Sequence, residues 1–364
     1  MLTVALDATP LVGDRTGIGV AVAGMVKGLA RRSDLALIGY GLTGAGWHKV
    51  RAHLPAGVRP ARARMPAGVF LRLWSRVPFP VIESWTGPVD VVHGTNFVVP
   101  PARRAERLVT VWDLAAVRFP ELCTATSRRY PHLVQRAVDT GAWVHTGSRF
   151  VADEIVNHFG VDPDRVFVVP PGVEVDGKRD HPRRSGPPYV LALGTVEQRK
   201  DFPGLVHAFD DIAGDHPELE LWIAGPPGWG ESQLSAAVAA ARHRDRVKRL
   251  GWLDDPGEVL RGAAVLAYPS LYEGFGFPPL EAMAVGVPVV ASAAGSVPEV
   301  TGDAAMLVAP GDAGAFAAAI STVLGDEVLR SSLVERGYRR VEAFNWEASS
   351  AALHRAYLEI AATR

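Results

Sequence analysis

Short apolar runs alternate with helical patterns along almost the whole chain. Leu2–Leu6 and Leu35–Tyr40 consist mostly of Val, Leu, Ile and Ala, which predicts strands that are buried on both faces. Segments such as Phe202–Ile212 instead place apolar residues at the spacing of one helix face. This alternation is typical of βαβ units, so the sequence predicts parallel sheets in an α/β fold.

The two halves of the chain show this pattern separately. In the first half we expect strands at Leu2–Leu6, Leu35–Tyr40, Asp90–His93, Leu108–Val111, Trp143–Thr146 and Val166–Val169, and helices at Gly19–Arg31, Thr126–Asp139 and Phe150–Phe159. In the second half we expect strands at Tyr189–Leu193, Glu220–Ala224, Val247–Leu250, Ala264–Ala267, Val287–Ala291 and Ala305–Val308. The second-half helices are expected at Phe202–Ile212, Gln233–Arg242, Pro256–Arg261, Pro279–Val285, Ala313–Leu324, Val328–Phe344 and Trp346–Ala361.

A stretch without periodicity separates the halves. Residues 171–188 are rich in Pro, Gly and charge, as interdomain linkers are. A chain of 364 residues also exceeds the usual size of one hydrophobic core. We therefore predict two facing Rossmann-like domains, 1–170 and 189–345, with the last helix, 346–364, returning to the first domain.

Composition narrows the class of protein. The formal net charge of −1 argues against a general nucleic-acid binder. The single cysteine, Cys123, excludes an intramolecular disulfide and a cysteine-based zinc site. No H-E-x-x-H motif occurs, and no D-x-D lies in a loop between expected strands, so we expect no dedicated metal site. Without a signal-peptide pattern or an apolar stretch of about 18 residues, we expect a cytoplasmic protein.

Two glycine-rich segments resemble nucleotide-binding motifs, but each lacks a residue that its motif requires. After Gly17 and Gly19, Val22 occupies the third glycine position of a dinucleotide fingerprint, and the preceding loop is too long for its tight turn. The segment from Gly172 to Lys178 resembles a phosphate loop, but Arg179 replaces the hydroxyl residue that would bind magnesium. Neither NAD binding nor a phosphate loop is expected at these positions.

A glycine-rich loop in the second half has the pattern of an anion site. A strand is expected to end near Tyr268, and Gly274 and Gly276 precede a helix that begins near residue 278. Free N–H groups at a helix N-terminus attract anions, so a diphosphate can bind there without a metal. Glu273 and Glu281 bracket the loop, and we expect both to face sugar or ribose hydroxyls rather than charge. Alternatively, Glu281 is a first-turn dipole partner and Glu273 a solvated loop residue.

A cation pair follows the first expected strand of the second half. Gly194 ends that strand, and Arg199 and Lys200 precede the next helix. The carboxyl ends of parallel strands are where α/β sheets bind ligands. Arg199 and Lys200 can therefore neutralise a leaving diphosphate in place of a divalent metal, although a solvated turn would have the same sequence.

These elements together resemble the large GT-B family of retaining glycosyltransferases that includes bacterial mannosyltransferases. The likeness rests on the E-GFGFPPL-E and GT-x-E-x-RK segments and the opening Gly-Ile-Gly loop, and it extends over nearly the whole chain. The resemblance implies catalytic roles for Glu273, Asp113, Arg199 and Lys200. It implies donor-binding roles for Gly17, Gly19, Gly194, Arg199, Lys200, Glu273, Gly274, Phe275, Gly276 and Glu281.

By this likeness, Glu281 would bind the ribose and Glu273 the donor sugar. Arg199 and Lys200 would bind the diphosphate, and Gly17 and Gly19 would close over the phosphates. The sequence departs from the family at Trp112, where a histidine usually precedes Asp113. Tryptophan cannot accept a hydrogen bond as a neutral imidazole can, so the usual sugar contact is in question.

An arginine-rich segment, 59–79, is the third feature. It carries Arg59, Arg62, Arg64, Arg72 and Arg76, no acidic residue, and interleaved Phe, Leu and Trp. Basic amphipathic segments bind anionic membranes or lipid-phosphate acceptors. An apolar face packed on its own domain is the alternative, and the sequence does not separate the two.

The resulting functional hypothesis is metal-independent hexosyl transfer from a nucleotide sugar to a glycan or lipid-linked acceptor. The resemblance favours GDP-mannose as the donor, with a UDP- or dTDP-sugar as alternatives, and no cofactor besides it. A sugar-nucleotide epimerase, a phosphorylase of the same fold and a non-catalytic nucleotide-sugar-binding protein are the rival functions.

Overall fold

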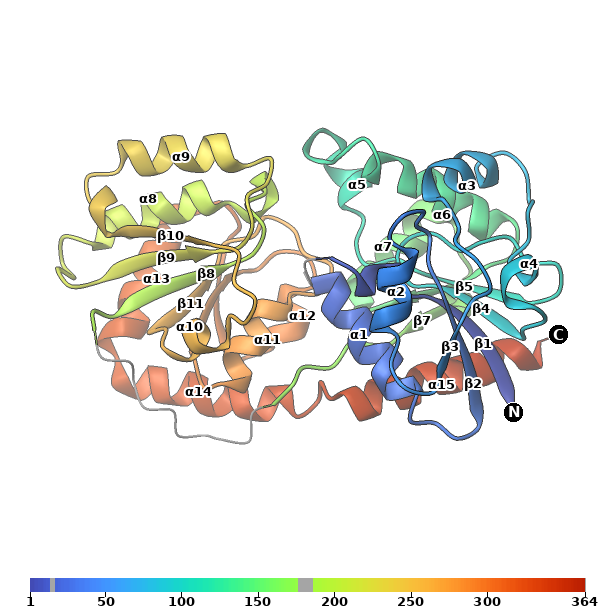
Figure 1. Cartoon of the computed structure of the whole chain (residues 1–364). Coiled ribbons are helices and arrows are strands. Elements are labelled where there is room, and N and C mark those ends of the chain that lie inside the picture. Colours follow the sequence, from blue (N-terminus) through green and yellow to red (C-terminus); the bar gives the residue numbers. More distant parts are fainter. Residues whose placement is uncertain (14–16, 176–185, 364) are drawn as a thin grey trace. The chain divides into compact units, whose positions relative to one another are not determined.

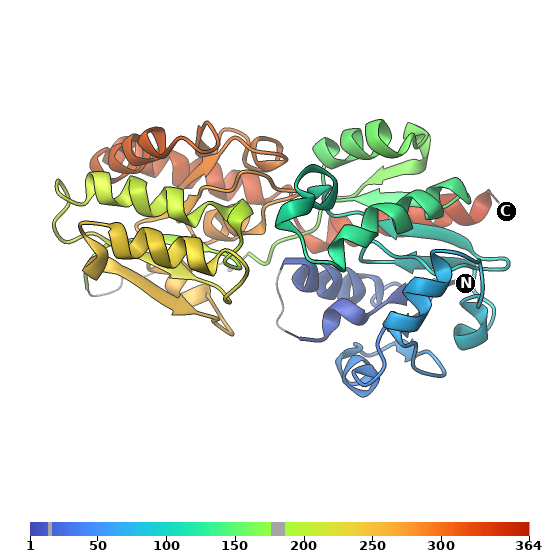
Figure 2. The same ribbon diagram turned by 90° about the horizontal axis from the view of Figure 1, so that it is seen from above.

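The computed structural model describes residues 1–13, 17–175 and 186–363. The chain divides into two compact units, and each is described by itself. The first unit contains Met1–Gly172 and Asn345–Arg364, and the second contains Val173–Phe344. Both ends of the chain therefore lie in the first unit, as Figures 1 and 2 show. Residues 176–185 of the expected linker lie outside the described residues.

The first unit is built on a parallel sheet, which has seven strands among the described residues, in the order β3-β2-β1-β4-β5-β6-β7. Its strands are β1 (Leu2–Asp7), β2 (Leu35–Tyr40), β3 (Val58–Pro60), β4 (Val91–Gly94), β5 (Glu106–Thr110), β6 (Trp143–Thr146) and β7 (Val166–Val168). Its helices are α1 (Gly17–Leu29), α2 (Trp47–His53), α3 (Ala67–Trp74), α4 (Glu83–Thr86), α5 (Ala115–Arg118), α6 (Tyr130–Asp139), α7 (Arg149–Phe159) and α15 (Trp346–Ala362).

The C-terminal helix α15 belongs to the first unit because it packs closely on α1. A Cβ atom at Gly24 would lie 2.3 Å from the ring of Trp346, and one at Gly28 would lie 2.7 Å from the Cβ of Ser350. Real Cβ atoms do not approach this closely, so only glycine allows the two helices to lie at this separation. The predicted return of the last helix to the first domain is confirmed.

Buried polar groups attach α15 to the sheet as well. The hydroxyl of Tyr357 and Nδ1 of His93 are 2.7 Å apart, and Nε2 of His93 lies 2.7 Å from Oγ1 of Thr110. Thr110 in turn lies 2.8 Å from Nδ1 of His145. All four side chains are buried. Because buried polar groups are costly when unpaired, this chain of hydrogen bonds favours one seating of α15 over the strands.

The second unit has a parallel sheet with six strands in its described part, in the order β10-β9-β8-β11-β12-β13. Its strands are β8 (Tyr189–Leu193), β9 (Glu220–Ala224), β10 (Val247–Gly251), β11 (Val265–Tyr268), β12 (Val289–Ser292) and β13 (Ala305–Val308). Its helices are α8 (Phe202–Ile212), α9 (Glu231–Ala240), α10 (Gly257–Arg261), α11 (Phe277–Ala284), α12 (Val297–Thr301), α13 (Ala313–Gly325) and α14 (Glu327–Val341). Figure 1 shows α8 and α9 on one side of the strands, and α10, α11 and α14 on the other.

The predicted fold class is confirmed, because both sheets are parallel and covered by helices. The arginine-rich segment 59–79 is not a single element. It contains the edge strand β3, the helix α3 and irregular backbone between and after them. Within the described ranges, no helix is long and apolar enough to span a membrane.

Candidate functional site

The candidate site of the second unit lies where the strand order reverses. β8 pairs with β9 on one side and with β11 on the other, so the loops after β8 and β11 leave the same edge of the sheet side by side. Ligands of open α/β sheets bind at such a position, outside the carboxyl ends of the strands. Arg199 and Lys200 come from the first of these loops and Glu273 from the second.

These three side chains form one cluster in which Lys200 and Glu273 are buried and Arg199 is partly exposed. Nζ of Lys200 lies 2.6 Å from Oε1 of Glu273, and Nη1 of Arg199 lies 3.0 Å from Oε2. Nζ of Lys200 also donates to the hydroxyl of Tyr268, at 3.1 Å. Arg199 additionally pairs with Glu197, at 3.2 Å. The cluster holds two cations and two carboxylates, and each carboxylate is within reach of a cation.

The structure corrects two expectations about Glu273. It is not a solvated loop residue, because only 6% of its surface is exposed. It also does not face hydroxyls alone, since each carboxylate oxygen lies against a cation. Burial by itself would raise the pKa of Glu273, but the charges of Arg199 and Lys200 outweigh burial and lower the pKa to about 2. Glu273 is therefore ionised throughout the physiological range.

Backbone contacts hold the two loops together. The N–H of Leu271 donates to the carbonyl of Arg199 at 2.8 Å, and Nη1 of Arg199 donates to the carbonyl of Tyr272 at 2.7 Å. Arg199 thus contacts the neighbouring loop through both its backbone and its side chain. The cluster is preorganised, since its geometry does not depend on one exposed ion pair.

Two residues that the sequence analysis missed support the glycine-rich loop. The N–H of Ser296 donates to the carbonyl of Glu273 at 3.0 Å, and its hydroxyl donates to the carbonyl of Phe275, also at 3.0 Å. A Cβ atom at Gly295 would lie 2.2 Å from the carbonyl oxygen of Glu273, and Gly295 has a φ of +59°. The Gly-Ser pair after an apolar run was the available signal, but nothing in the sequence indicates which loop it contacts.

Free amides follow the cluster. Phe275, Gly276 and Phe277 are buried, and none of their N–H groups donates to any group in the described part of the chain. Gly276, with a φ of +96°, is the N-cap of α11. Phe277 is the first residue of α11, and the two residues after it, Pro278 and Pro279, carry no N–H. The anion-binding capacity at this end of α11 therefore lies in residues 275–277, because buried amides without partners are rare.

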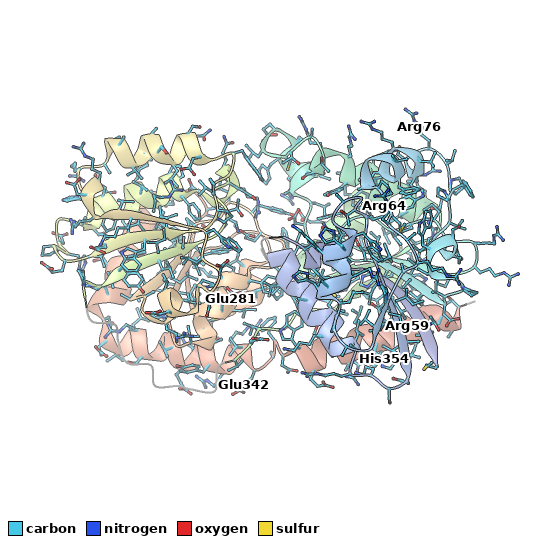
Figure 3. All side chains as sticks on the ribbon, viewed as in Figure 1. Arg59, Arg64, Arg76, Glu281, Glu342 and His354 are labelled. Atoms are coloured by element: carbon cyan, nitrogen blue, oxygen red, sulfur yellow. The ribbon has the colours of Figure 1, made fainter. Side chains whose placement is uncertain are left out.

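Glu281 occupies a different environment from Glu273. It lies on α11 in the second unit (Figure 3), one position beyond the first turn in which it was expected. No hydrogen bond or ion pair within the described residues engages its carboxyl group. Burial raises the pKa of Glu281 to about 7. Two carboxylates eight positions apart in the sequence thus have widely separated pKa values, a pattern typical of functional sites.

The remaining predicted residues divide between the two units. Gly194, which directly follows β8, has a φ of +149° and lies beside the side chain of Lys200. Gly17 and Gly19 begin α1 in the first unit, directly after residues that lie outside the description. Asp113 follows β5, and its carboxylate accepts the N–H of Ala115 at 3.0 Å. The structure brings Gly194, Arg199, Lys200 and Glu273 together. The donor contacts of the site residues in both units stay predictions.

Trp112, at the position where the family usually has histidine, is a buried structural residue. Its Nε1 donates to the carbonyl of Thr95 at 2.9 Å, and its ring lies edge-on to His145. Only 6% of its surface is exposed. The indole is therefore engaged within the first unit.

In the arginine-rich segment 59–79, charged and aromatic side chains point in different directions. All five arginines are exposed, and Figure 3 shows the three that it labels, Arg59, Arg64 and Arg76, well apart from one another. Trp74 is buried and donates to the carbonyl of Pro80, while Phe70 stacks on its ring at 5.3 Å. Trp74 thus packs inward, and Phe70 and Leu71 are partly buried against the core of the first unit. These three side chains follow the alternative in which the apolar face packs on its own domain.

Comparisons with known proteins agree on one family. The profile described as Glycosyl transferases group 1 matches residues 176–340. The chain is 32% identical over 272 residues to O-antigen chain mannosyltransferase B of Escherichia coli, covering 71% of each chain. It is also 32% identical to the MMP alpha-(1->4)-mannosyltransferase of Mycolicibacterium hassiacum, over 76% of this chain and 64% of that one.

Solved structures share the whole fold at lower identity. Sucrose-phosphate synthase from Thermosynechococcus elongatus matches with a TM-score of 0.76, 20% identity and full coverage of both chains. Anabaena HepE in complex with UDP and glucose matches with a TM-score of 0.76 and 18% identity, over 99% of this chain and 100% of that one. At these identities the likeness establishes the GT-B fold alone.

Proposed function

We propose that this chain, which belongs to the Glycosyl transferases group 1 family of retaining glycosyltransferases, transfers mannose from GDP-mannose to a glycan or lipid-linked acceptor without a metal ion. The family uses nucleotide-sugar donors. The choice of mannose draws support from two relatives whose names describe mannosyltransferases. The choice of GDP rests on the family resemblance of the sequence.

One observation carries the placement of the donor: the cation–carboxylate cluster adjoins buried free amides at the carboxyl edge of the sheet. In a sugar nucleotide, the diphosphate and the sugar are bonded directly to each other. A carboxylate for sugar hydroxyls must therefore lie close to the cations for the phosphate, and Glu273 lies within 3.0 Å of both Arg199 and Lys200. The amides of residues 275–277 supply further donors to the same anion.

The cations take the part that a divalent metal plays in other transferases. As the bond between sugar and diphosphate breaks, negative charge develops on the departing oxygen. Arg199 and Lys200 are preorganised by Glu273, so little reorganisation is needed when that charge appears. Glu273 is proposed to contact the donor sugar, whose anomeric carbon becomes electron-poor as the bond breaks. Asp113 is proposed to make a polar contact from the first unit.

Glu281 is proposed to bind the ribose. Its partly exposed carboxyl group has no partner within the described residues, and a pair of ribose hydroxyls would provide hydrogen-bond donors to it. Gly17 and Gly19 are proposed to approach the phosphates from the first unit. The acceptor hydroxyl attacks on the face from which the diphosphate leaves, which gives the retention of configuration that defines the family.

Two experiments test the proposal against its rivals. Thermal unfolding with GDP, UDP and dTDP identifies the nucleotide, because a ligand that binds only the folded state raises the melting temperature. Assays for transfer, hydrolysis and epimerisation with the matching sugar nucleotides then separate a transferase from an epimerase, a phosphorylase or a non-catalytic binder. Stabilisation by UDP and none by GDP would contradict the proposed donor.

A further inference from the structure

A cavity of the first unit lies between the end of α3, the loop before β5 and the last turns of α6. Its volume is about 230 Å³, and the guanidinium groups of Arg107 and Arg136 both line it. Its apolar wall includes Trp74 and Leu133. No Asp or Glu of the described residues lines the cavity. The wall therefore combines positive charge with apolar surface.

The two guanidinium groups have few protein partners. Arg107 donates from Nη1 to Oγ1 of Thr140 at 3.1 Å and from Nη2 to the carbonyl of Thr140. Arg136 donates from Nη2 to the carbonyl of Arg76 at 3.1 Å. Neither arginine forms an ion pair in the part of the chain that the structure describes. A guanidinium group has five N–H donors, so both retain donors for a ligand.

Positive charge dominates at the cavity. Burial lowers the pKa of Arg107, while the charge of Glu106 opposes this shift and that of Arg165 adds to it. Arginine stays protonated despite such a shift. Thr140 is the C-cap of α6, so the helix dipole contributes roughly half a negative charge there. Two full positive charges outweigh this contribution, and the cavity therefore attracts anions.

The cavity is separate from the carboxyl edge of the sheet. Arg107 is the second residue of β5, whereas Asp113 follows the other end of this strand. At about 3.3 Å per residue, the rest of β5 separates Arg107 from that edge by roughly 10 Å. An anion bound by Arg107 would thus lie near the amino edge, away from the polar contact predicted for Asp113.

We propose that this cavity binds a small organic phosphate monoester. Its phosphate would lie between Arg107 and Arg136, and its organic group would lie against the apolar wall. A phosphate monoester carries close to two negative charges and three terminal oxygens, which suit two guanidinium groups that reach the cavity from a strand and a helix. A carboxylate has one charge and two oxygens in one plane, so it suits a single guanidinium group better.

The size of the cavity limits the organic group. Pockets for drug-sized ligands measure roughly 300–1,000 Å³, and this cavity is smaller, at about 230 Å³. The ligand is therefore compact, of the size of a phosphorylated ring. The proposal concerns the first unit alone and holds even if the donor proposed above is wrong.

Calorimetry with phenyl phosphate as the probe tests the cavity. The intact protein should bind phenyl phosphate, bind inorganic phosphate severalfold more weakly, and show no measurable binding of phenol. Arg136→Gln removes charge-assisted hydrogen bonds and should weaken binding about tenfold or more, and Arg107→Gln with Arg136→Gln should abolish it. The matched control, Arg31→Gln with Arg51→Gln, removes two exposed arginines of the same unit and should bind like the parent.

A carboxylate placed in the cavity tests the charge with both arginines intact. Ala102 lines the cavity and is partly exposed. Ala102→Glu should abolish the binding of phenyl phosphate and leave the melting temperature equal or higher, because the new carboxylate pairs with a cation. Ala102→Gln has the same shape without the charge and should weaken binding severalfold at most.

Four results would overturn the proposal. No measurable binding of phenyl phosphate to the intact protein, or equal binding by the parent and Arg136→Gln, would refute the site. Succinate that binds as tightly as phenyl phosphate would contradict the choice of a phosphate. Inorganic phosphate that binds as tightly would exclude a contribution from the apolar wall. Binding that is lost in Arg199→Ala with Lys200→Ala and retained in the cavity variants would place the anion in the donor site.

Discussion

Replacing Glu281 by glutamine should stabilise the fold and weaken donor binding at the same time. The carboxyl group is partly exposed and has no partner within the described residues, and its desolvation by the surrounding protein raises its pKa from 4.5 to about 7. One pKa unit corresponds to about 1.4 kcal/mol, so keeping Glu281 ionised in the folded protein costs about 3 kcal/mol. Glutamine has nearly the same shape and no charge, and it removes that cost.

The stabilising effect of Glu281→Gln should depend on pH. Below pH 4.5 both the folded and the unfolded chain carry the proton on Glu281, so the penalty is absent. Between pH 4.5 and 7 the folded state retains a proton that the unfolded state has lost, and stability falls as the pH rises. Above pH 7 the penalty is complete. The stabilising effect of Glu281→Gln should therefore be absent near pH 4.5 and reach about 3 kcal/mol near pH 8.

Chemical denaturation at several pH values measures this difference, with Glu335→Gln, an exposed site on α14, as the control. Nucleotide affinity, measured by calorimetry at pH 8, should fall about tenfold in Glu281→Gln because charge-assisted hydrogen bonds to the ribose become neutral ones. Glu281→Ala should lose roughly 2–3 kcal/mol of binding. A glutamine variant less stable than the parent at pH 8 would refute the burial argument, and unchanged affinity would refute the ribose assignment.

Three further substitutions test the site and its support. Arg199→Ala removes one partner of the buried Glu273, so the variant should lose roughly 3–5 kcal/mol of unfolding free energy and about a hundredfold in turnover. Adding Glu273→Gln should restore the stability and leave the turnover low. Recovery of both would contradict the proposed role of the cluster. Gly295→Ala would place a Cβ atom 2.2 Å from a backbone oxygen and should lower the melting temperature by several degrees; an unchanged melting temperature would show that the loop moves freely. Tyr357→Phe removes the hydroxyl that lies 2.7 Å from Nδ1 of His93 and should lower the unfolding free energy by about 1–3 kcal/mol. An unchanged unfolding free energy would mean that this hydrogen bond does not hold α15 on the sheet.

The sheets could be predicted because their strands are buried on both faces. Continuous apolar runs such as Tyr189–Leu193 and Glu220–Ala224 match the observed strands to the residue. The strand Val58–Pro60 was missed since three residues that include Arg and Pro have no apolar pattern, and an edge strand does not need one. Helix α3 was not among the expected helices, because the arginine-rich segment 59–79 was considered for its charge and contains several short elements.

The sequence indicated which residues form the site, but not how their side chains pair. Residue types and strand positions indicated that Lys200 and Glu273 belong to one edge of the sheet. Their direct pairing joins positions 73 apart in the sequence, and it depends on how two loops pack, which no local pattern encodes. The inward turn of Trp74 similarly depends on the neighbouring rings of Phe70 and Trp85, which lie 5.2 Å apart.

The most direct test of the account is release of the nucleotide and transfer of mannose from GDP-mannose in the presence of excess EDTA, followed by proton NMR of the anomeric signal. If Arg199 and Lys200 replace a metal, the parent protein should turn over at an undiminished rate in chelator and yield the configuration of the donor. The double variant Arg199→Ala with Lys200→Ala should be inactive under the same conditions. Turnover that stops in EDTA and returns with magnesium or manganese would contradict the account.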